Sequence, residues 1–528
     1  MNHPPMSDVD RMPVRGSERG AILPMMAIML IVLMGAAAMA VDLGWLFWNS
    51  FEIQHGADAA ALSGVVYEPD HRAEAHAEGI GGAAENGYVD TSLGGPDTVQ
   101  IIDSVDDPSL VEHDNQLRAT ITHSVPTFFL KVFGIDSVDI QRTAVAQYTL
   151  PLFLGSPEAY LGADPSRGLA PGFWVSIHGT WAKKNHGDRY GDGCLGEATG
   201  LGCPQNPEHR PSLNPGQANA SGGYVYGIEV PAGAGNLSLE IFDGPWYDCP
   251  FSTSTCGKFL TGDQQESGTT WFMLYGPDPT PLDTTDGNEL LCVIKYDPRS
   301  PGRSVDIPGW DDTNWDDWED VVPQSLIGEL WDSMATSADR QPGCAGNFDR
   351  GPGIYPLRVL MEHDDSQESY NKFSFRVTTT GSAPSIFGLG DMSVYANADS
   401  GSDTRIFLAE VEDLHAGKDL IIELFDVGDI SGGSGGDRLE FYDGSGALVK
   451  CSWESDDGDS GSLGPCVIDA PNTRFNGELL TITIPIAGDY TCTGLACWYR
   501  FRYVYTGDVN DTTTWTAFVA GNPIRIIE

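Results

Sequence analysis

Three aspartates lie near one another around a glycine-rich loop in the C-terminal part of the chain. They are Asp426, Asp429 and Asp437, and the segment 432–440 reads GGSGGDRLE. Carboxylate oxygens on a flexible loop are ligands that Ca²⁺ prefers. The nine residues match one copy of a calcium-binding nonapeptide, but that fold needs stacked copies and the chain has one. The sequence thus offers a candidate calcium site, with a solvated acidic turn as the alternative.

A serine motif is the second candidate for chemistry. GDSGS at 458–462 is similar to the sequence around the nucleophile of chymotrypsin-like proteases. A nucleophilic serine needs a histidine base that a carboxylate orients, and the histidine motif of that family does not precede it. Neither H-E-x-x-H nor a P-loop occurs. We interpret the motif as coincidental and expect a protein that is not an enzyme and has no catalytic residues.

All ten cysteines lie after residue 190. An even number of cysteines in an exported region is typical of disulfides. The alternative, zinc, is usually held by closely spaced cysteines and histidines, and no such cluster occurs. Pairing of sequence neighbours is the simplest arrangement, although connectivity does not follow from sequence. The disulfide candidates are Cys194, Cys203, Cys249, Cys256, Cys292, Cys344, Cys451, Cys466, Cys492 and Cys497.

Three tryptophans stand in an acidic stretch, GWDDTNWDDWEDVV. Trp310, Trp315 and Trp318 could stack on sugars or bind a partner, because exposed tryptophan is costly unless it is used. The alternative is that their rings cover a neighbouring sheet while the aspartates face water. The sequence leaves both interpretations open.

The net charge excludes one class of partner. The chain has 29 lysines and arginines against 75 aspartates and glutamates, which gives a net charge of −46. Binding of nucleic acid depends on cations that neutralise phosphates. We therefore expect no nucleic-acid partner; the acidity suits a solvated outer surface, cation binding or a saline habitat.

An apolar segment near the N-terminus predicts a membrane anchor. Residues 21–41 carry no charge and have about the 20 residues that a helix needs to cross a bilayer. Arg11, Arg15 and Arg19 precede this segment, and the next basic residue is Arg72. The positive-inside rule then places residues 1–20 in the cytoplasm and the body outside. We expect a single-pass protein of a bacterial cytoplasmic membrane, with the lipid bilayer as the partner of residues 21–41.

One processing alternative competes with this anchor. Ala38, Met39 and Ala40 fit a signal-peptidase site, which would release the protein. Because the apolar pattern continues past them, we favour the uncleaved anchor. Asp42 could be a functional intramembrane carboxylate; we expect a hydrated residue at the outer edge of the span.

Periodicity then predicts an α+β segment followed by β-structure. Residues 49–67 and 71–88 have helical patterns, and alternating strands follow up to residue 148, with a short helix near 127–133 between them. After residue 150, short alternating runs and turn clusters indicate β-sandwiches. A further helix is expected near 323–334.

The β-rich part contains two similar segments. YVYGIEVPAGAGNLSLEIFDG at 224–244 parallels RIFLAEVEDLHAGKDLIIELFDVG at 405–428. We therefore predict two related sandwiches, the first with an insert. The expected domains are a tail (1–20), a transmembrane helix and its extension (21–48), an α+β domain (49–150) and β-sandwiches at 151–380 and 381–528.

The N-terminal part resembles a known family. An Arg-Gly pair, the apolar run, AVDLG and ADAAALSG at 57–64 are similar to the N-terminal domain of TadG-like proteins of the bacterial Flp (tight adherence, Tad) pilus system. The similarity extends more weakly through 116–148 and covers nothing beyond. It implies a pilin-like α+β domain. Many members also carry a von Willebrand A domain, but DDSQE at 364–368 lacks the second serine of its metal motif, so that activity is not expected.

These observations together predict a membrane-anchored, extracytoplasmic protein related to Tad pilus assembly or surface adhesion. It would act by binding other Tad or envelope proteins, and not by catalysis. Two alternatives stay open: an exported hydrolase with accessory sandwiches, and a calcium-stabilised structural surface protein.

Overall fold

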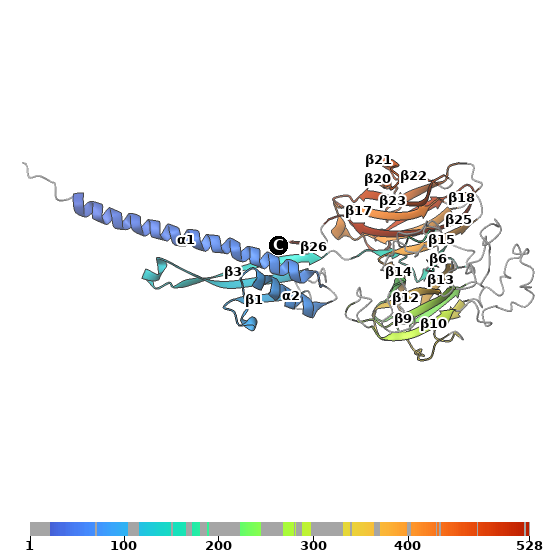
Figure 1. Cartoon of the computed structure of the whole chain (residues 1–528), viewed down its shortest axis with the longest axis horizontal. Helices are drawn as coiled ribbons and strands as arrows, with labels where there is room; N and C mark the ends of the chain where they lie inside the picture. The colour runs from blue at the N-terminus through green and yellow to red at the C-terminus, as the bar shows by residue number, and fades with distance from the viewer. Residues whose placement is uncertain are drawn as a thin grey trace, which may run out of the picture. The chain divides into compact units, whose positions relative to one another are not determined.

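A computed structural model of the chain (Figure 1) describes most residues between 22 and 526. The described ranges are 22–68, 71–103, 116–148, 151–164, 172–179, 187–189, 222–243, 268–278, 280, 288–296, 331–337, 340–363, 370–398, 403–428, 430–431, 435–471, 474–521 and 524–526. The chain divides into two compact units, residues 1–149 with 523–528, and residues 150–522. The predicted fold class, an apolar helix with an α+β domain followed by β-sandwich structure, is confirmed.

The first unit is built on a long helix and a four-stranded antiparallel sheet in the order β1-β2-β3-β26. Its helices are α1 (Ile22–Val65) and α2 (Arg72–Glu85), with the short 3-10 helices η1 (Thr91–Leu93) and η3 (Leu130–Phe133). Its strands are β1 (Thr98–Asp103), β2 (Gln116–Pro126), β3 (Ser137–Tyr148) and β26 (Ile524–Ile526).

Small residues let the second half of α1 pack closely in this unit. Ile53, Ala57, Ala60 and Val65 are fully buried in one core with α2 and the sheet. A Cβ placed on Gly64 would lie 2.6 Å from the carbonyl oxygen of Ala75 in α2. The alanine-rich sequence after the apolar segment is therefore the helix face that the two helices and the sheet share.

The C-terminal strand of the chain belongs to this first unit. β26 pairs antiparallel with the end of β3, with Ile524 opposite Tyr148 and Ile526 opposite Ala146. A short apolar run such as IRII carries no signal for its partner strand, so this return is a feature that sequence reasoning missed. The α+β unit thus contains both ends of the described chain.

The second unit consists of two large sheets. The ten-stranded sheet has the order β10-β9-β12-β7-β14-β4-β16-β24-β19-β22. Its strands are β4 (Phe153–Gly155), β7 (Tyr224–Val230), β9 (Gly268–Tyr275), β10 (Leu290–Tyr296), β12 (Gly353–His363), β14 (Ser385–Leu389), β16 (Asp403–Glu410), β19 (Arg438–Tyr442), β22 (Val467–Asp469) and β24 (Trp498–Val504).

The twelve-stranded sheet has the order β11-β8-β13-β6-β15-β25-β17-β23-β20-β21, with β5 beside β13 and β18 beside β25. Its strands are β5 (Tyr160–Leu161), β6 (Phe173–His178), β8 (Ser238–Asp243), β11 (Trp331–Ser333), β13 (Tyr370–Thr378), β15 (Met392–Ala398), β17 (Asp419–Val427), β18 (Ile430–Ser431), β20 (Lys450–Ser455), β21 (Ser460–Pro465), β23 (Phe475–Pro485) and β25 (Asp508–Val519). Two 3-10 helices, η6 (Asp413–His415) and η7 (Gly494–Cys497), lie in the connections.

Aromatic side chains join the two sheets face to face. Trp515 of β25 is buried, stands edge-on to Phe501 of β24, and donates its indole N–H to the carbonyl oxygen of Leu408 in β16 at 3.1 Å. Tyr226 of β7 similarly meets Phe375 of β13. Such packing of inward-facing side chains from two sheets defines a β-sandwich.

The two similar sequence segments contribute equivalent strands. β7 and β16 lie in the ten-stranded sheet, and β8 and β17, which follow them, lie in the other. The first strands of the two predicted sandwiches, β4 and β14, are exchanged, because β4 pairs with β16 and β14 pairs with β7. β4 and β14 also pair with each other, and the rings of Phe153 and Phe387 stack there with centroids 4.1 Å apart. Both segments therefore build the same two sheets, and the boundary near residue 381 stays a prediction.

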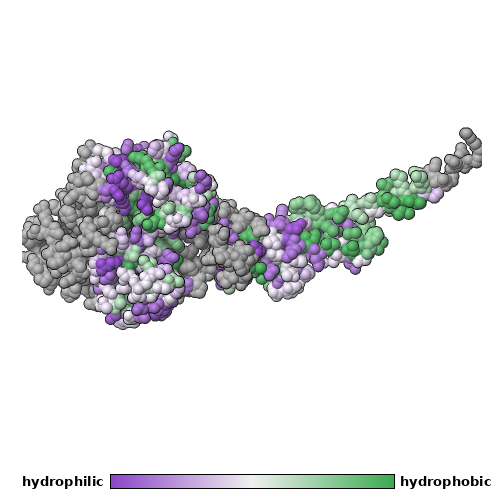
Figure 2. Space-filling view, turned by 180° about the vertical axis from the view of Figure 1, so that it is seen from behind, coloured by the Kyte–Doolittle hydropathy of each residue, from purple (hydrophilic) through white to green (hydrophobic). Residues whose placement is uncertain are grey.

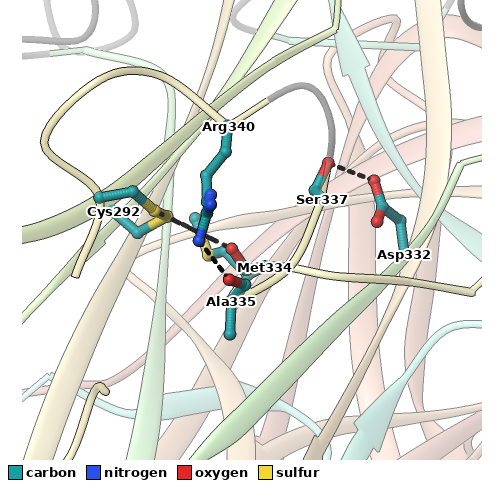
Figure 3. The surroundings of a disulfide bond; sticks show 7 residues. Cys292, Asp332, Met334, Ala335, Ser337 and Arg340 are labelled. Carbon is teal, nitrogen blue, oxygen red and sulfur yellow. Dashed lines mark hydrogen bonds between the residues drawn. A yellow bond between two sulfur atoms is a disulfide. The ribbon is translucent and has the colours of Figure 1, made fainter. Parts of the chain in front are cut away.

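Within the described residues, three disulfides reinforce the second unit, and each joins two cysteines that have no other cysteine between them in the sequence. They are Cys292–Cys344, Cys451–Cys466 and Cys492–Cys497. Figure 3 shows the surroundings of Cys292, where the Ser337 hydroxyl donates to the Asp332 carboxylate and Arg340 donates to the carbonyl oxygen of Ala335, each at 2.5 Å. The other four candidates, Cys194, Cys203, Cys249 and Cys256, lie outside the described residues.

One local prediction is wrong at its C-terminal end. The helix expected near 323–334 is replaced over Trp331–Ser333 by strand β11, and residues 323–330 lie outside the described chain. Trp331 pairs with Phe242 of β8, and the Arg376 guanidinium lies over its ring, 4.3 Å from the centroid. Tertiary pairing thus overrides the local helical pattern here.

Candidate membrane-proximal site

The N-terminal half of α1 exposes large apolar side chains. Met25, Ile28, Leu30 and Ile31 each leave more than half of their surface uncovered by protein. Figure 2 colours much of this exposed helix as hydrophobic. α1 is the helix of the described chain that is long and apolar enough to cross a membrane, and the qualifying stretch begins at Pro24. A solvated helix of this composition would be unfavourable, so the surface fits a lipid environment.

Asp42, directly after the apolar segment, is fully buried. Its carboxylate accepts hydrogen bonds from three consecutive backbone N–H groups in the loop between β2 and β3. Phe128 donates to Oδ1 at 2.8 Å, and Phe129 and Leu130 donate to Oδ2 at 2.9 and 2.6 Å. Phe128 and Phe129 directly precede η3, and Leu130 is its first residue. N–H groups at a helix start lack partners within the helix, so the carboxylate satisfies them. The loop in turn compensates a charge that would be costly at a membrane edge.

This contact corrects the sequence interpretation of Asp42. A hydrated residue was expected, but the carboxylate is covered by protein and its oxygens bind the β2–β3 loop. The pairing joins positions 86 to 88 residues apart, which no local pattern reveals. One signal was available in the sequence. An aspartate beside an apolar run requires a partner, and the predicted short helix in PTFFLKVFG at 126–134 offers free backbone N–H groups at its start.

Further contacts fix the direction of the β2–β3 hairpin along α1. Gln54 donates to the carbonyl oxygen of Thr143 at 3.0 Å, and one turn earlier Ser50 accepts a hydrogen bond from Arg142. Asp42, two turns earlier again, meets the loop itself. The hairpin therefore runs from the buried half of α1 toward the apolar half, as Figure 1 shows for β3. Its tip is the part of the sheet closest to the candidate span.

The tip and the facing turns of α1 carry exposed aromatic residues. The rings of Trp45 and Phe128 lie 5.5 Å apart, and those of Phe47 and Phe51 meet edge to face. Val132 and Phe133 at the tip are 83% and 77% exposed. Tryptophan beside a membrane span is typical of the interfacial region, and the exposed phenylalanines add apolar surface there.

The candidate calcium ligands are only partly described. Asp437 is buried and accepts the backbone N–H and the hydroxyl of Thr506 at 2.6 and 2.8 Å. Asp426 is also buried, has a positive φ of 57°, and accepts the backbone N–H of Gly477. Asp429 lies outside the described residues. Among the residues that are described, no group of three or more metal-binding side chains occurs. The calcium site stays a prediction.

Two further sequence motifs were candidates for function: the GDSGS segment and the tryptophan-rich stretch. Ser460 of the GDSGS motif begins β21, in a hairpin that the Cys451–Cys466 bridge closes, and Asp459 pairs with Arg474 at 3.0 Å. This is a structural hairpin. The three tryptophans at 310, 315 and 318 lie outside the described residues.

A buried polar cluster in the sandwich was not foreseen. The Asp188 carboxylate accepts the Tyr224 hydroxyl at 2.7 Å and the backbone N–H of His178 at 3.2 Å. Thr514 donates to the carbonyl oxygen of the adjacent Gly187 at 2.8 Å. Burial, with the charge of Asp188, raises the pKa of Tyr224 well above its usual value. The cluster attaches residues 187–189 to β6, β7 and β25, which is a structural role.

Glu410 is a carboxyl group with a strongly raised pKa in the second unit. Burial at the end of β16, followed by repulsion from Glu412 and Glu229, raises its pKa to about 7. It stands opposite Trp498 in the sheet. Perturbed groups mark functional sites only when partners for catalysis adjoin them, and the neighbours that perturb Glu410 are two further carboxylates. We assign it no catalytic role.

Comparison with known proteins gives one finding. No curated protein and no solved structure matches the chain significantly. Residues 20–67, which contain the apolar segment, Asp42 and the buried half of α1, match the model of the family described as putative Flp pilus-assembly TadE/G-like. The segment from 20 to 67 is thus a TadE/G-like segment, and α1 is its helix.

Proposed function

We propose that the protein is a membrane-anchored, extracytoplasmic component of Tad pilus assembly or of surface adhesion, and that it acts by binding. The observation that carries this proposal is that one half of α1 is exposed and apolar while the other half packs in the folded core. The TadE/G-like match covers the exposed apolar half of the helix and the half that packs in the α+β core. A helix of this kind joins an anchor rigidly to the domain that it presents.

The orientation rests on charge. Arg11, Arg15 and Arg19 precede the apolar segment, and no basic residue follows it until Arg72. The positive-inside rule favours an N-terminus in the cytoplasm, with the chain after residue 41 outside. Disulfides in the second unit support the same assignment, because they persist in oxidising compartments.

A binding role is supported by the kind of body that the anchor presents. The second unit is a disulfide-linked sandwich, and the buried polar groups described above serve its own strands and loops. Large rigid β-surfaces on an anchor suit recognition of other proteins. The proposed partners are Tad pilus or envelope proteins, and not nucleic acid.

Protease treatment of intact spheroplasts tests the orientation. The body should be degraded while a small fragment around residues 1–48 is protected. A second arm tests the pilus role in the native strain: deletion of the gene should reduce Flp pili and surface attachment, and the full chain should restore them. A chain in which residues 1–41 are replaced by a cleavable signal peptide should not. Protection of the C-terminal body, or normal pili in the deletion strain, would contradict the proposal.

A further inference from the structure

The β2–β3 hairpin tip is held at the depth where the bilayer begins. Asp42 follows the last residue of the apolar segment 21–41 and bonds directly to Phe128, Phe129 and Leu130. At 1.5 Å per residue, Trp45 and Trp48 stand roughly 6 and 10 Å beyond Val41. Each polar layer of a bilayer is about 5–8 Å thick. If α1 spans the membrane, the tip therefore lies at the level of the headgroups.

The composition of the tip suits that level. Between Thr127 and Asp136 the segment reads FFLKVFGI, and Phe128, Phe129, Val132 and Phe133 are all exposed in the folded unit. So many exposed apolar side chains on one short loop would be unfavourable in water. Lys131, which is also exposed, can extend its ammonium group to phosphates while its stem stays apolar.

The backbone of the loop is prepared for such an environment. Unpaired N–H groups are costly in an apolar medium, and Asp42 accepts those of Phe128 and Phe129, just before η3, and of Leu130, its first residue. Thr127 donates its hydroxyl to Ile135, and the Gly134 N–H bonds to the carbonyl oxygen of Lys131 at 2.9 Å. The tip thus presents apolar side chains and Lys131 outward, while these backbone N–H groups and the Thr127 hydroxyl bond within the unit.

We propose that residues 128–133 form a second membrane contact, which inserts into the headgroup and acyl boundary of the bilayer that α1 crosses. The contact fixes the tilt of the α+β unit at the membrane surface, because a single helix alone leaves rotation and tilt free. This inference rests on the membrane anchoring in the proposed function. It adds that the folded unit itself, and not only its helix, binds lipid.

Site-directed spin labelling tests the contact on the full chain in vesicles of phosphatidylethanolamine and phosphatidylglycerol. The label is placed at Val132→Cys, and the matched control is Leu93→Cys, another exposed apolar position, in η1. Tyr88, just before η1, packs against Gly56, which lies about 21 Å further along α1 than Asp42. We expect a ratio of oxygen to nickel-chelate collisions several-fold higher at position 132 than at position 93.

Each other outcome would overturn the inference in a distinct way. Equal ratios at the two positions would show that the tip is in water. A label at position 132 that neither reagent reaches would show that protein, such as a second copy of the chain, covers it. Carbonate extraction separates this from failure of the anchor: protein that resists extraction but has a hydrated tip contradicts only the lipid contact, whereas extracted protein contradicts the proposed function.

Discussion

The Asp42 carboxylate and the backbone N–H of Leu130 are 2.6 Å apart, although 88 positions separate them in the chain. With the N–H groups of Phe128 and Phe129, this bond closes the β2–β3 hairpin onto α1 just outside the apolar segment. The apolar half of α1 is therefore joined rigidly to the folded unit. A displacement of the helix within the membrane is transmitted to the sheet without a flexible linker.

Asp42→Asn should loosen this junction without a change in volume. The amide has one acceptor oxygen in place of two and no charge, so at least one buried N–H group loses its partner. Hydrogen bonds to charged groups contribute about 1.5–3 kcal/mol each, and we expect local stability of the hairpin to fall by about that amount. Hydrogen exchange of a peptide covering 127–136 measures it. Asp139→Asn, at an exposed position of β3, is the control, and unchanged exchange in Asp42→Asn would refute the coupling.

Two glycines test the packing of α1 on α2. Gly64→Ala would place its Cβ 2.6 Å from the carbonyl oxygen of Ala75, so the helices must separate. We expect a loss of about 1–3 kcal/mol. Gly81→Ala on α2 is the matched control, since a Cβ there meets nothing within 4 Å and alanine favours a helix by about 1 kcal/mol. Thermal unfolding in detergent should separate the two variants in opposite directions; equal melting temperatures would contradict the close approach.

The sequence predicted where helices and strands form better than which of them contact one another. A run of 20 apolar residues and the alternation after residue 115 depend on local spacing, so α1, β2 and β3 were foreseen. The contact of Asp42 with η3 and the pairing of β26 with β3 join distant positions, and no local pattern encodes them. The exchange of β4 and β14 was hidden for a related reason: similar segments have similar strands, and either copy satisfies the same pattern.

Because β4 pairs with β16, the calcium prediction must be tested on the full chain. A fragment of residues 381–528 would lack β4, the partner of β16, so the full chain in detergent is required. If Asp426, Asp429 and Asp437 bind Ca²⁺, millimolar calcium should raise the melting temperature of the second unit by mass action. Magnesium should do less, because it requires a tighter octahedron.

The variant for this test is Asp437→Ala, and the quantity compared is the calcium-dependent rise, not the melting temperature itself. Asp437 also accepts two hydrogen bonds from Thr506, so its loss lowers stability with or without metal. An absent rise in the parent protein, or an equal rise in the variant, would leave only an acidic turn.

The raised pKa of Glu410 predicts that the stability of the second unit depends on pH. Burial first, and then the charges of Glu412 and Glu229, raise the pKa of Glu410 from 4.5 to about 7 in the folded state. The folded protein therefore keeps a proton that the unfolded chain releases above pH 4.5. The stabilisation from this group is complete below pH 4.5 and is lost as the pH rises to about 7. Because the side chain is partly exposed, we expect a loss of about 1–2 kcal/mol.

Glu410→Gln should remove this dependence. The amide has the shape of the protonated acid and does not ionise, so the variant should gain stability relative to the parent between pH 5 and pH 8. Calorimetry of the second unit's transition at these two pH values measures the difference, and Glu454→Gln, at an exposed position of β20, controls for the loss of one negative charge. A difference between Glu410→Gln and the parent that is the same at both pH values would show that Glu410 is ionised throughout. The repulsion from Glu412 and Glu229 would then be screened by solvent.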